Sequence, residues 1–199
     1  EDEHSIDVVL LELQNQMQNV QSGVILVYMD RGLRYYNDGK CELAYDDFKT
    51  ASILIETTKS KNSSDYIVAQ NNIALCEMEM GRYSDAIKTL DDISIVARQQ
   101  FGDDSYLYAT CLLNYGIYYQ AVFDYERLLD VSLVAQNIYE RLYGTENLDY
   151  ARASANAGVA YTWMGDHDKA EKNLAIAYAI ISKQSDSEND LLLAKILQN

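Results

Sequence analysis

Three asparagines recur at a constant spacing and could bind a peptide backbone. Asn72, Asn114 and Asn156 follow one another at one fixed interval. A side-chain amide offers both a hydrogen-bond donor and an acceptor, so a row of amides can pair with an extended peptide whatever its side chains are. The same amides could instead tie neighbouring helices together or simply be solvated. Asp30 takes this position one interval earlier, where a carboxylate favours a donor or a basic group.

Residues that could support catalysis are few and scattered. The chain has two histidines, His4 near its start and His167 in a predicted turn. Catalysis needs converging groups with tuned pKa values, and neither histidine shares a credible site with a cysteine. The acid pair Asp103-Asp104 fits a helix cap or a solvated surface better than an active site. No nucleophile-elbow, zinc-protease or phosphate-loop motif occurs. We therefore expect no enzyme activity, no metal site and no cofactor.

Composition restricts the partners of the chain. Its 199 residues include 31 acidic and 16 basic side chains, for a net charge of −15. Such a chain repels nucleic acids and anionic membrane surfaces, so we expect a neutral to basic protein or peptide as partner. Cys41, Cys76 and Cys111 lack metal-ligand spacing, which favours reduced thiols in a cytoplasmic protein. No apolar run reaches the ~18 residues of a membrane span.

The asparagines belong to a repeating helix pair that must position them. The interval between them, about 42 residues, is of the length that marks repeat architectures. The same interval relates small residues in each predicted first helix, namely Gly32, Ala74, Gly116 and Gly158. It also relates the turn glycines Gly39, Gly81 and Gly165, whereas the third unit turns at Phe123-Asp124. A unit of two helices leaves one apolar face uncovered, and a neighbouring unit must cover it. The pattern therefore predicts an all-α solenoid of antiparallel helix pairs.

The second helices alternate small and bulky residues, except in the third unit. Three units carry alanine followed four residues later by a bulky side chain: Ala44 and Phe48, Ala86 and Leu90, Ala170 and Leu174. The third unit reverses the sizes, with Leu128 at the small position and Ser132 at the bulky one. We expect Leu128 to supply there the volume that Ser132 lacks.

The repeat interval also predicts the domain organisation. Four repeats occupy residues 22–185, at about 22–63, 64–105, 106–147 and 148–185. Residues 1–21 form a flanking or capping helix, and residues 186–199 form a partial fifth repeat or a C-terminal cap. The chain opens on EDEH without an initiator Met, which fits a segment excised from a longer protein.

This pattern resembles the tetratricopeptide repeat (TPR). That family places a small residue in the first helix, an aromatic three positions later, and then alanine, a bulky residue and alanine along the second helix. The best matches are Gly32, Tyr35, Gly39, Ala44, Phe48 and Ala51, and Gly158, Tyr161, Gly165, Ala170, Leu174 and Ala177. The usual period of the family is shorter, at about 34 residues. The longer period here is similar to the kinesin-light-chain type, whose units end as Phe101-Gly102 and Tyr143-Gly144 do, although this chain lacks the proline common in those turns.

The resemblance implies an open right-handed superhelix whose first helices line a concave, ligand-binding face. Among the groove positions carried over from the family, only Asp30, Glu79 and Arg152 are charged. We therefore do not expect the Lys/Arg clamp that some family members use to hold a terminal carboxylate. The candidate contacts are Tyr36, Asn71, Asn72, Met78, Asn114, Gln120, Arg152, Asn156 and Trp163.

These observations predict a protein–protein interaction scaffold that binds a peptide or protein segment in the concave groove. One alternative is a regulatory segment of a larger signalling protein, in which a peptide or effector changes the pitch of the superhelix. Another is a structural module that self-assembles through uncapped ends and a tyrosine-rich surface made by Tyr106, Tyr108, Tyr115, Tyr118 and Tyr119.

Overall fold

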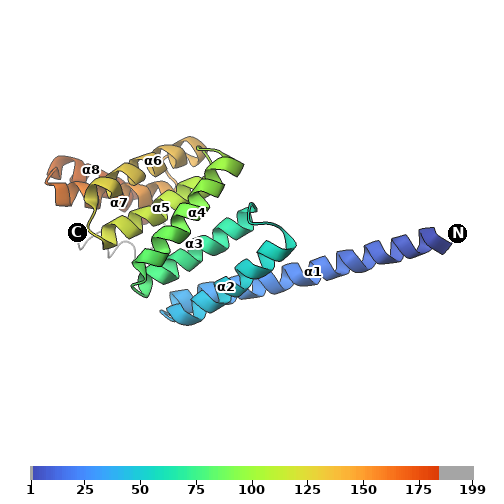
Figure 1. The fold of residues 1–199 in the computed structure, drawn as a ribbon. Helices are drawn as coiled ribbons and strands as arrows, with labels where there is room; N and C mark the ends of the chain where they lie inside the picture. Colours follow the sequence, from blue (N-terminus) through green and yellow to red (C-terminus); the bar gives the residue numbers. More distant parts are fainter. Residues whose placement is uncertain (1, 184–199) are drawn as a thin grey trace. The chain divides into compact units, whose positions relative to one another are not determined.

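The computed structural model describes residues 2–183, in which every regular element is an α-helix (Figure 1). The helices are α1 (Asp2–Asn37), α2 (Cys41–Thr58), α3 (Ser64–Glu79), α4 (Tyr83–Phe101), α5 (Tyr106–Ala121), α6 (Tyr125–Tyr143), α7 (Leu148–Met164) and α8 (His167–Ile181). None of these helices is long and apolar enough to cross a membrane. The chain divides into two compact units, Glu1–Thr89 and Leu90–Asn199. The helix predicted at Leu191–Leu197 lies outside the described residues.

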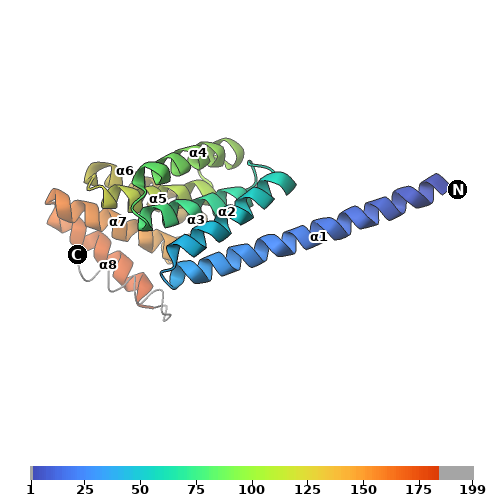
Figure 2. The same cartoon turned by 60° about the horizontal axis from the view of Figure 1, so that its bottom comes forward.

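Helix α1 differs from the sequence prediction because it is continuous. A flanking helix and a first repeat helix were expected on either side of Gly23, but one helix runs from Asp2 to Asn37. Glycine weakens a helix interior by roughly 1 kcal/mol relative to alanine, and without a proline or a polar turn that cost does not break the helix. The first half of α1 projects away from α2, and its second half packs against the repeat (Figure 2).

The second half of α1 is held by an apolar contact and an ion pair. Ile25 is buried against Ile55 of α2 and Ala69 of α3. One turn and a half later, the Arg31 guanidinium donates from both Nε and Nη2 to the buried Asp47 carboxylate, each at 2.7 Å. This bidentate hydrogen bonding raises the pKa of Arg31 further and fixes α1 against α2.

Close helix approach depends on the predicted small residues. A Cβ atom placed on Gly32 would lie 2.7 Å from the Phe48 ring. On Gly158 it would lie 2.7 Å from the Leu174 side chain and 3.2 Å from the Leu174 backbone nitrogen. Both distances are shorter than a normal van der Waals contact, so glycine is what permits these helix pairs to pack. In the third repeat Leu128 is fully buried, and its Cδ1 atom lies 3.5 Å from the position that a Cβ atom on Gly116 would take.

The turns repeat one backbone conformation, including the turn that lacks glycine. Gly39, Gly81 and Gly165 have φ values of 73°, 73° and 79°. Phe123 occupies the equivalent position with φ of 61°, and its side chain is 74% exposed. A bulky residue in this left-handed region is strained, at a cost on the order of 1–2 kcal/mol. The third turn therefore keeps the shape of the others at an energetic cost.

Replacing Phe123 by glycine should raise the free energy of unfolding by about 1 kcal/mol, because glycine adopts a positive φ without strain. The Phe123 ring contacts Tyr125 edge-on, with ring centroids 6.4 Å apart, so Phe123→Ala serves as the control that removes the ring and keeps a Cβ atom. Urea denaturation of the three proteins measures the difference. A Phe123→Ala protein as stable as Phe123→Gly would show that the backbone conformation is not the cause.

Each of the two compact units contains a hydrogen bond between a buried serine and a glutamine, and the two pairs stand at the same positions of the repeat. In the first unit the Gln70 Nε2 of α3 donates to Ser52 Oγ of α2 at 2.8 Å. In the second unit the Gln136 Nε2 of α6 donates to Ser154 Oγ of α7, also at 2.8 Å. The residues are exchanged between the two helices, yet the hydrogen bond is retained. The same hydrogen bond thus links the second helix of one repeat to the first helix of the next.

The cysteines are free thiols in the described chain. Cys76 is buried in a cluster with Ala44, Phe48 and Ile73, and Cys41 is partly exposed. Burial raises the pKa of the Cys76 thiol to about 12, which keeps it protonated and poorly nucleophilic at neutral pH. This environment is that of a packed core residue, and it fits the reduced thiols predicted from the sequence.

Candidate peptide-binding surface

Helices α5 and α7 position five of the candidate contacts, and capping residues fix where both helices begin. Ser105 Oγ accepts a hydrogen bond from the Tyr108 backbone N–H at 3.2 Å. Asn147 Oδ1 accepts from the backbone N–H groups of Asp149 and Tyr150, at 2.8 and 3.2 Å. Side-chain oxygens at this position satisfy amides that would otherwise lack partners at the start of a helix. The caps therefore set which residues each helix presents.

Asn156 of α7 lies directly against the backbone of α5. Its Nδ2 atom is 2.7 Å from the position that a Cβ atom on Gly116 would occupy. The glycine thus creates the space into which the amide fits. Asn156 is half-buried, and within residues 2–183 its amide has no hydrogen-bond partner. Its donor and acceptor are consequently left for a ligand or for water.

The other candidate asparagines fall into two groups. Asn71 and Asn114 are buried, at 3% and 6% exposure, and both interact with neighbouring groups. Their environment fits the structural interpretation, in which an amide ties helices together. Asn72 is half-buried like Asn156. The equal spacing of Asn72, Asn114 and Asn156 therefore does not give them equal surroundings, because burial depends on the neighbouring helix at each repeat.

The remaining candidates in the second unit are more open. Gln120 is half-buried near the end of α5. Arg152 pairs with Asp149 across one helical turn, with 3.2 Å between Nη1 and Oδ1. Trp163 is 62% exposed and stacks on Tyr125 of α6, with ring centroids 5.2 Å apart and ring planes at 6°. An exposed indole held by stacking is a rigid apolar contact available to a partner.

The two candidates in the first unit that are neither amides nor charged belong to its core. Tyr36 packs against the cluster that contains Phe48 and Cys76, and burial raises the pKa of its phenol. Met78 is 5% exposed. Apolar and aromatic residues at helical spacing are more often packed than presented, and that holds for both positions here.

The prediction of a tyrosine-rich surface on α5 is wrong in part. Tyr115 is buried, and its hydroxyl donates to Asp91 Oδ1 at 2.6 Å and lies 3.2 Å from Ser94 Oγ. Burial, with this carboxylate beside it, raises the pKa of Tyr115. Tyr106 is exposed, whereas Tyr119 is half-buried and stacks on Tyr115. These tyrosines mainly tie α5 to its neighbours, a role that their sequence spacing did not indicate.

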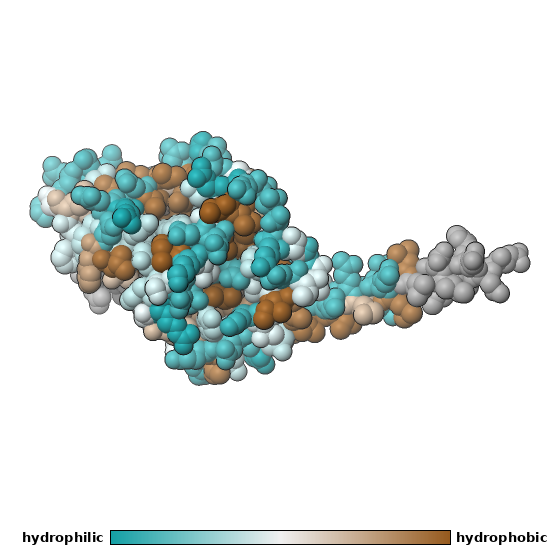
Figure 3. All heavy atoms as spheres, in the orientation of Figure 1, coloured by the Kyte–Doolittle hydropathy of each residue, from teal (hydrophilic) through white to brown (hydrophobic). Residues whose placement is uncertain are grey.

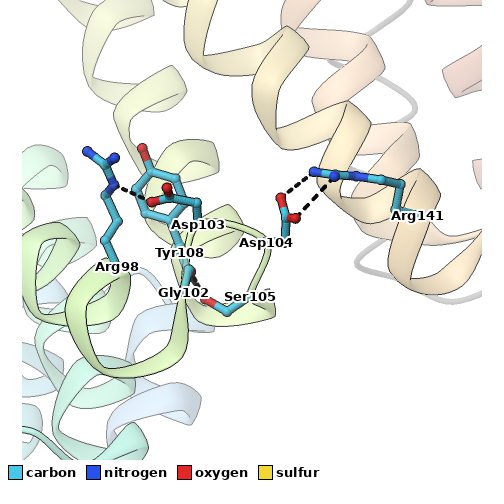
Figure 4. A network of polar contacts seen from close by, with 7 residues as sticks. All are labelled: Arg98, Gly102, Asp103, Asp104, Ser105, Tyr108 and Arg141. Atoms are coloured by element: carbon cyan, nitrogen blue, oxygen red, sulfur yellow. Dashed lines mark hydrogen bonds and ion pairs between the residues drawn. The ribbon is translucent and has the colours of Figure 1, made fainter.

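The loop between α4 and α5 carries an ion-pair network at Asp103 and Asp104, where the sequence predicts a helix cap or a solvated surface (Figure 4). Ser105 is the cap, while Asp103 accepts from Arg98 Nε at 2.6 Å and Asp104 pairs with Arg141 of α6. The Asp104–Arg141 pair recurs one repeat later as Glu146 and Lys183, with 2.8 Å between Oε2 and Nζ. The last two pairs therefore link the end of α6 to the loop before α5, and Lys183, just after α8, to the loop before α7, whereas Arg98 pairs with the loop that follows its own helix. No cluster of potential metal ligands occurs in the described residues.

Comparison with known proteins supports the fold. A tetratricopeptide-repeat family model matches residues 65–127, and no curated protein sequence matches the chain. The structure of BtubC (BKLC) from P. vanneervenii is similar, with a TM-score of 0.68 and 19% identity over 82% of this chain and 68% of that one. A kinesin light chain of Podosopora anserina with nearly identical TPR-like repeats has a TM-score of 0.67 and 16% identity, covering 87% and 85% of the two chains.

A third solved structure, the apo form of RapI, also has a TM-score of 0.67, at 13% identity. It covers 87% of this chain, which spans 46% of RapI. At these identities the likeness concerns the fold alone. The fold is a TPR-like α-solenoid, as the residue pattern predicts, and two of the three structures are named as kinesin-light-chain proteins or carry that abbreviation. A tetratricopeptide-repeat family model thus matches residues 65–127, and the similar structures share the TPR-like fold of the chain.

Proposed function

We propose that the chain is a protein–protein interaction scaffold that binds an extended peptide segment on the face formed by α5 and α7. Tetratricopeptide repeats support an interaction role in general, because stacked repeats create extended surfaces. The observation that carries the specific proposal is the half-buried Asn156 amide, which lies against Gly116 and has no partner among the described residues. An amide so placed can donate to a peptide carbonyl and accept from a peptide N–H.

The neighbouring side chains favour an uncharged or weakly basic peptide. Ile117 on α5 is 43% exposed, Gln120 adds an amide, and Trp163 presents its indole at the end of α7. Arg152, the one basic candidate, is already paired with Asp149. The surface therefore offers apolar contacts and amide hydrogen bonds, in a chain whose net charge of −15 would attract a basic segment. Enzyme activity and cofactor binding have no part in this proposal, and the cytoplasmic location remains a prediction from the cysteines.

Peptides selected from a random displayed library on the immobilised chain provide the probe for a binding test. We expect fluorescence anisotropy to give Kd values in the micromolar range, about 8 kcal/mol of binding free energy. Asn156→Ala should weaken binding about tenfold, since one hydrogen bond to a partly buried group contributes about 1–1.5 kcal/mol.

The matched control is Asn137→Ala, which removes an exposed amide from α6 by the same chemical change. It should leave Kd unchanged. Equal affinity of the wild-type and Asn156→Ala proteins for every selected peptide would show that this face is not the binding surface.

A further inference from the structure

An apolar stripe at coiled-coil spacing runs from the projecting half of α1 into the half that packs on the repeat. Its members follow one another at alternating intervals of four and three residues: Leu13, Met17, Val20, Val24 and Val27. The same spacing continues in the sequence to Leu10 and Ile6. Apolar residues sustained at these intervals over three heptads are typical of helices that pair with another helix. We refer to Leu13–Val27 as the α1 stripe.

The α1 stripe is exposed along its whole length. Its five side chains are 50%, 64%, 67%, 41% and 61% exposed, in chain order. Apolar residues are also visible on the projecting helix in Figure 3. The face that holds α1 on the first unit is a different one, centred on Ile25, which is 5% exposed. Within residues 2–183 the stripe therefore lies outside the packed face of α1 and is open to a second helix.

The residues that flank the stripe indicate what that second helix is. Residues 13–29 contain no charged side chain, although the whole chain carries a net charge of −15. The positions beside the stripe are amides such as Gln14, Gln16 and Gln21. Two copies of so acidic a chain repel each other least where like charges are absent, and amides complement one another because each donates and accepts. A charged partner helix, by contrast, would find no opposite charge to select it.

We propose that α1 pairs with α1 of a second copy of this chain in a two-stranded coiled coil. Met17 and Val24 occupy the a positions of the heptad, and Leu13, Val20 and Val27 occupy the d positions. The stripe from Leu13 to Val27 is about 21 Å long at 1.5 Å per residue, so the pairing is short and we expect micromolar dissociation. The dimer would present two repeat arrays and so bind a partner with two recognition segments more tightly than one chain can.

Sedimentation equilibrium of the full chain between roughly 5 and 300 µM tests the pairing, since this range brackets a micromolar Kd. The wild-type mass should rise from 22.6 kDa toward twice that value. The variant Met17→Glu/Val20→Glu adds two charges within the stripe and should remain monomeric throughout. Both residues are more than 60% exposed in the single chain, so the variant should keep its helicity by circular dichroism.

The matched control is Gln18→Glu/Asn19→Asp, which adds the same charge to exposed positions on the outer side of α1. It should dimerise like the wild type. A wild type that stays monomeric, a stripe variant that still dimerises, or a control that dissociates as fully as the stripe variant would each overturn the proposal. Association through stacked repeat ends would survive the stripe variant and is thereby distinguished.

Discussion

Replacing Leu128 by alanine should lower the free energy of unfolding by about 2–5 kcal/mol, one of the largest losses expected for a single substitution in this chain. Leu128 is fully buried and packs against Val159 and Ala160 of α7, with Tyr119 and Tyr125 around it. The lost side chain would leave a cavity that the surrounding helices can only partly close. Urea denaturation followed by circular dichroism measures the change. The control is Leu142→Ala, because Leu142 lies on the same helix and is 41% exposed. It should lower the free energy of unfolding by less than about 1 kcal/mol.

A second substitution tests why leucine stands at this position. Three repeats place alanine there and a bulky residue four positions later, where the third repeat has the buried Ser132. If Leu128 supplies the volume that Ser132 lacks, the double variant Leu128→Ala/Ser132→Leu should recover a substantial part of the stability lost by Leu128→Ala. A double variant no more stable than the single one would show that the two positions do not share one space.

Replacing Gly158 by alanine should destabilise the chain by about 1–3 kcal/mol. The new methyl group would meet the Leu174 side chain at 2.7 Å and its backbone nitrogen at 3.2 Å. The leucine side chain can rotate, but the backbone of α8 must move away from α7. This steric cost outweighs the roughly 1 kcal/mol that alanine gains over glycine in a helix.

The matched control is the same change at Gly23. Gly23 lies inside α1, and no atom approaches within 4 Å of the position that its Cβ would take. Gly23→Ala should therefore stabilise the chain by about 1 kcal/mol, through helix propensity alone. If close packing is the reason for glycine at position 158, urea denaturation should show a lower free energy of unfolding for Gly158→Ala and a higher one for Gly23→Ala. A loss of similar size at both positions would contradict that reason.

The repeat interval predicted most of the fold. Gly39, Gly81 and Gly165 all stand in turns, where each has a positive φ, and Gly32 and Gly158 allow close packing of helices. These features were predictable because glycine is the residue type that tolerates a positive φ or a close contact between helices. The position of Phe123 in the same conformation was not, since its residue type opposes the backbone that the repeat imposes.

Burial at the candidate site was harder to predict. Asn114 and Asn156 stand at equivalent positions, yet the first is buried and the second half-buried. Tyr115 was assigned to the surface and instead donates to Asp91. A helical period shows which residues share a face, but the depth of that face depends on the neighbouring repeat. The repeat interval separates residues 1–21 from the first repeat, but Gly23 alone does not interrupt α1, because one glycine weakens a helix without ending it.

Photo-crosslinking with a selected peptide tests the interaction surface most directly. A benzophenone side chain placed within the peptide would form covalent adducts with nearby C–H bonds, and mass spectrometry of the digested chain would locate them. The scaffold account predicts adducts on α5 and α7, near Asn156 and Trp163, that an excess of unlabelled peptide suppresses. Adducts confined to α6 and α8, and suppressed in the same way, would contradict it.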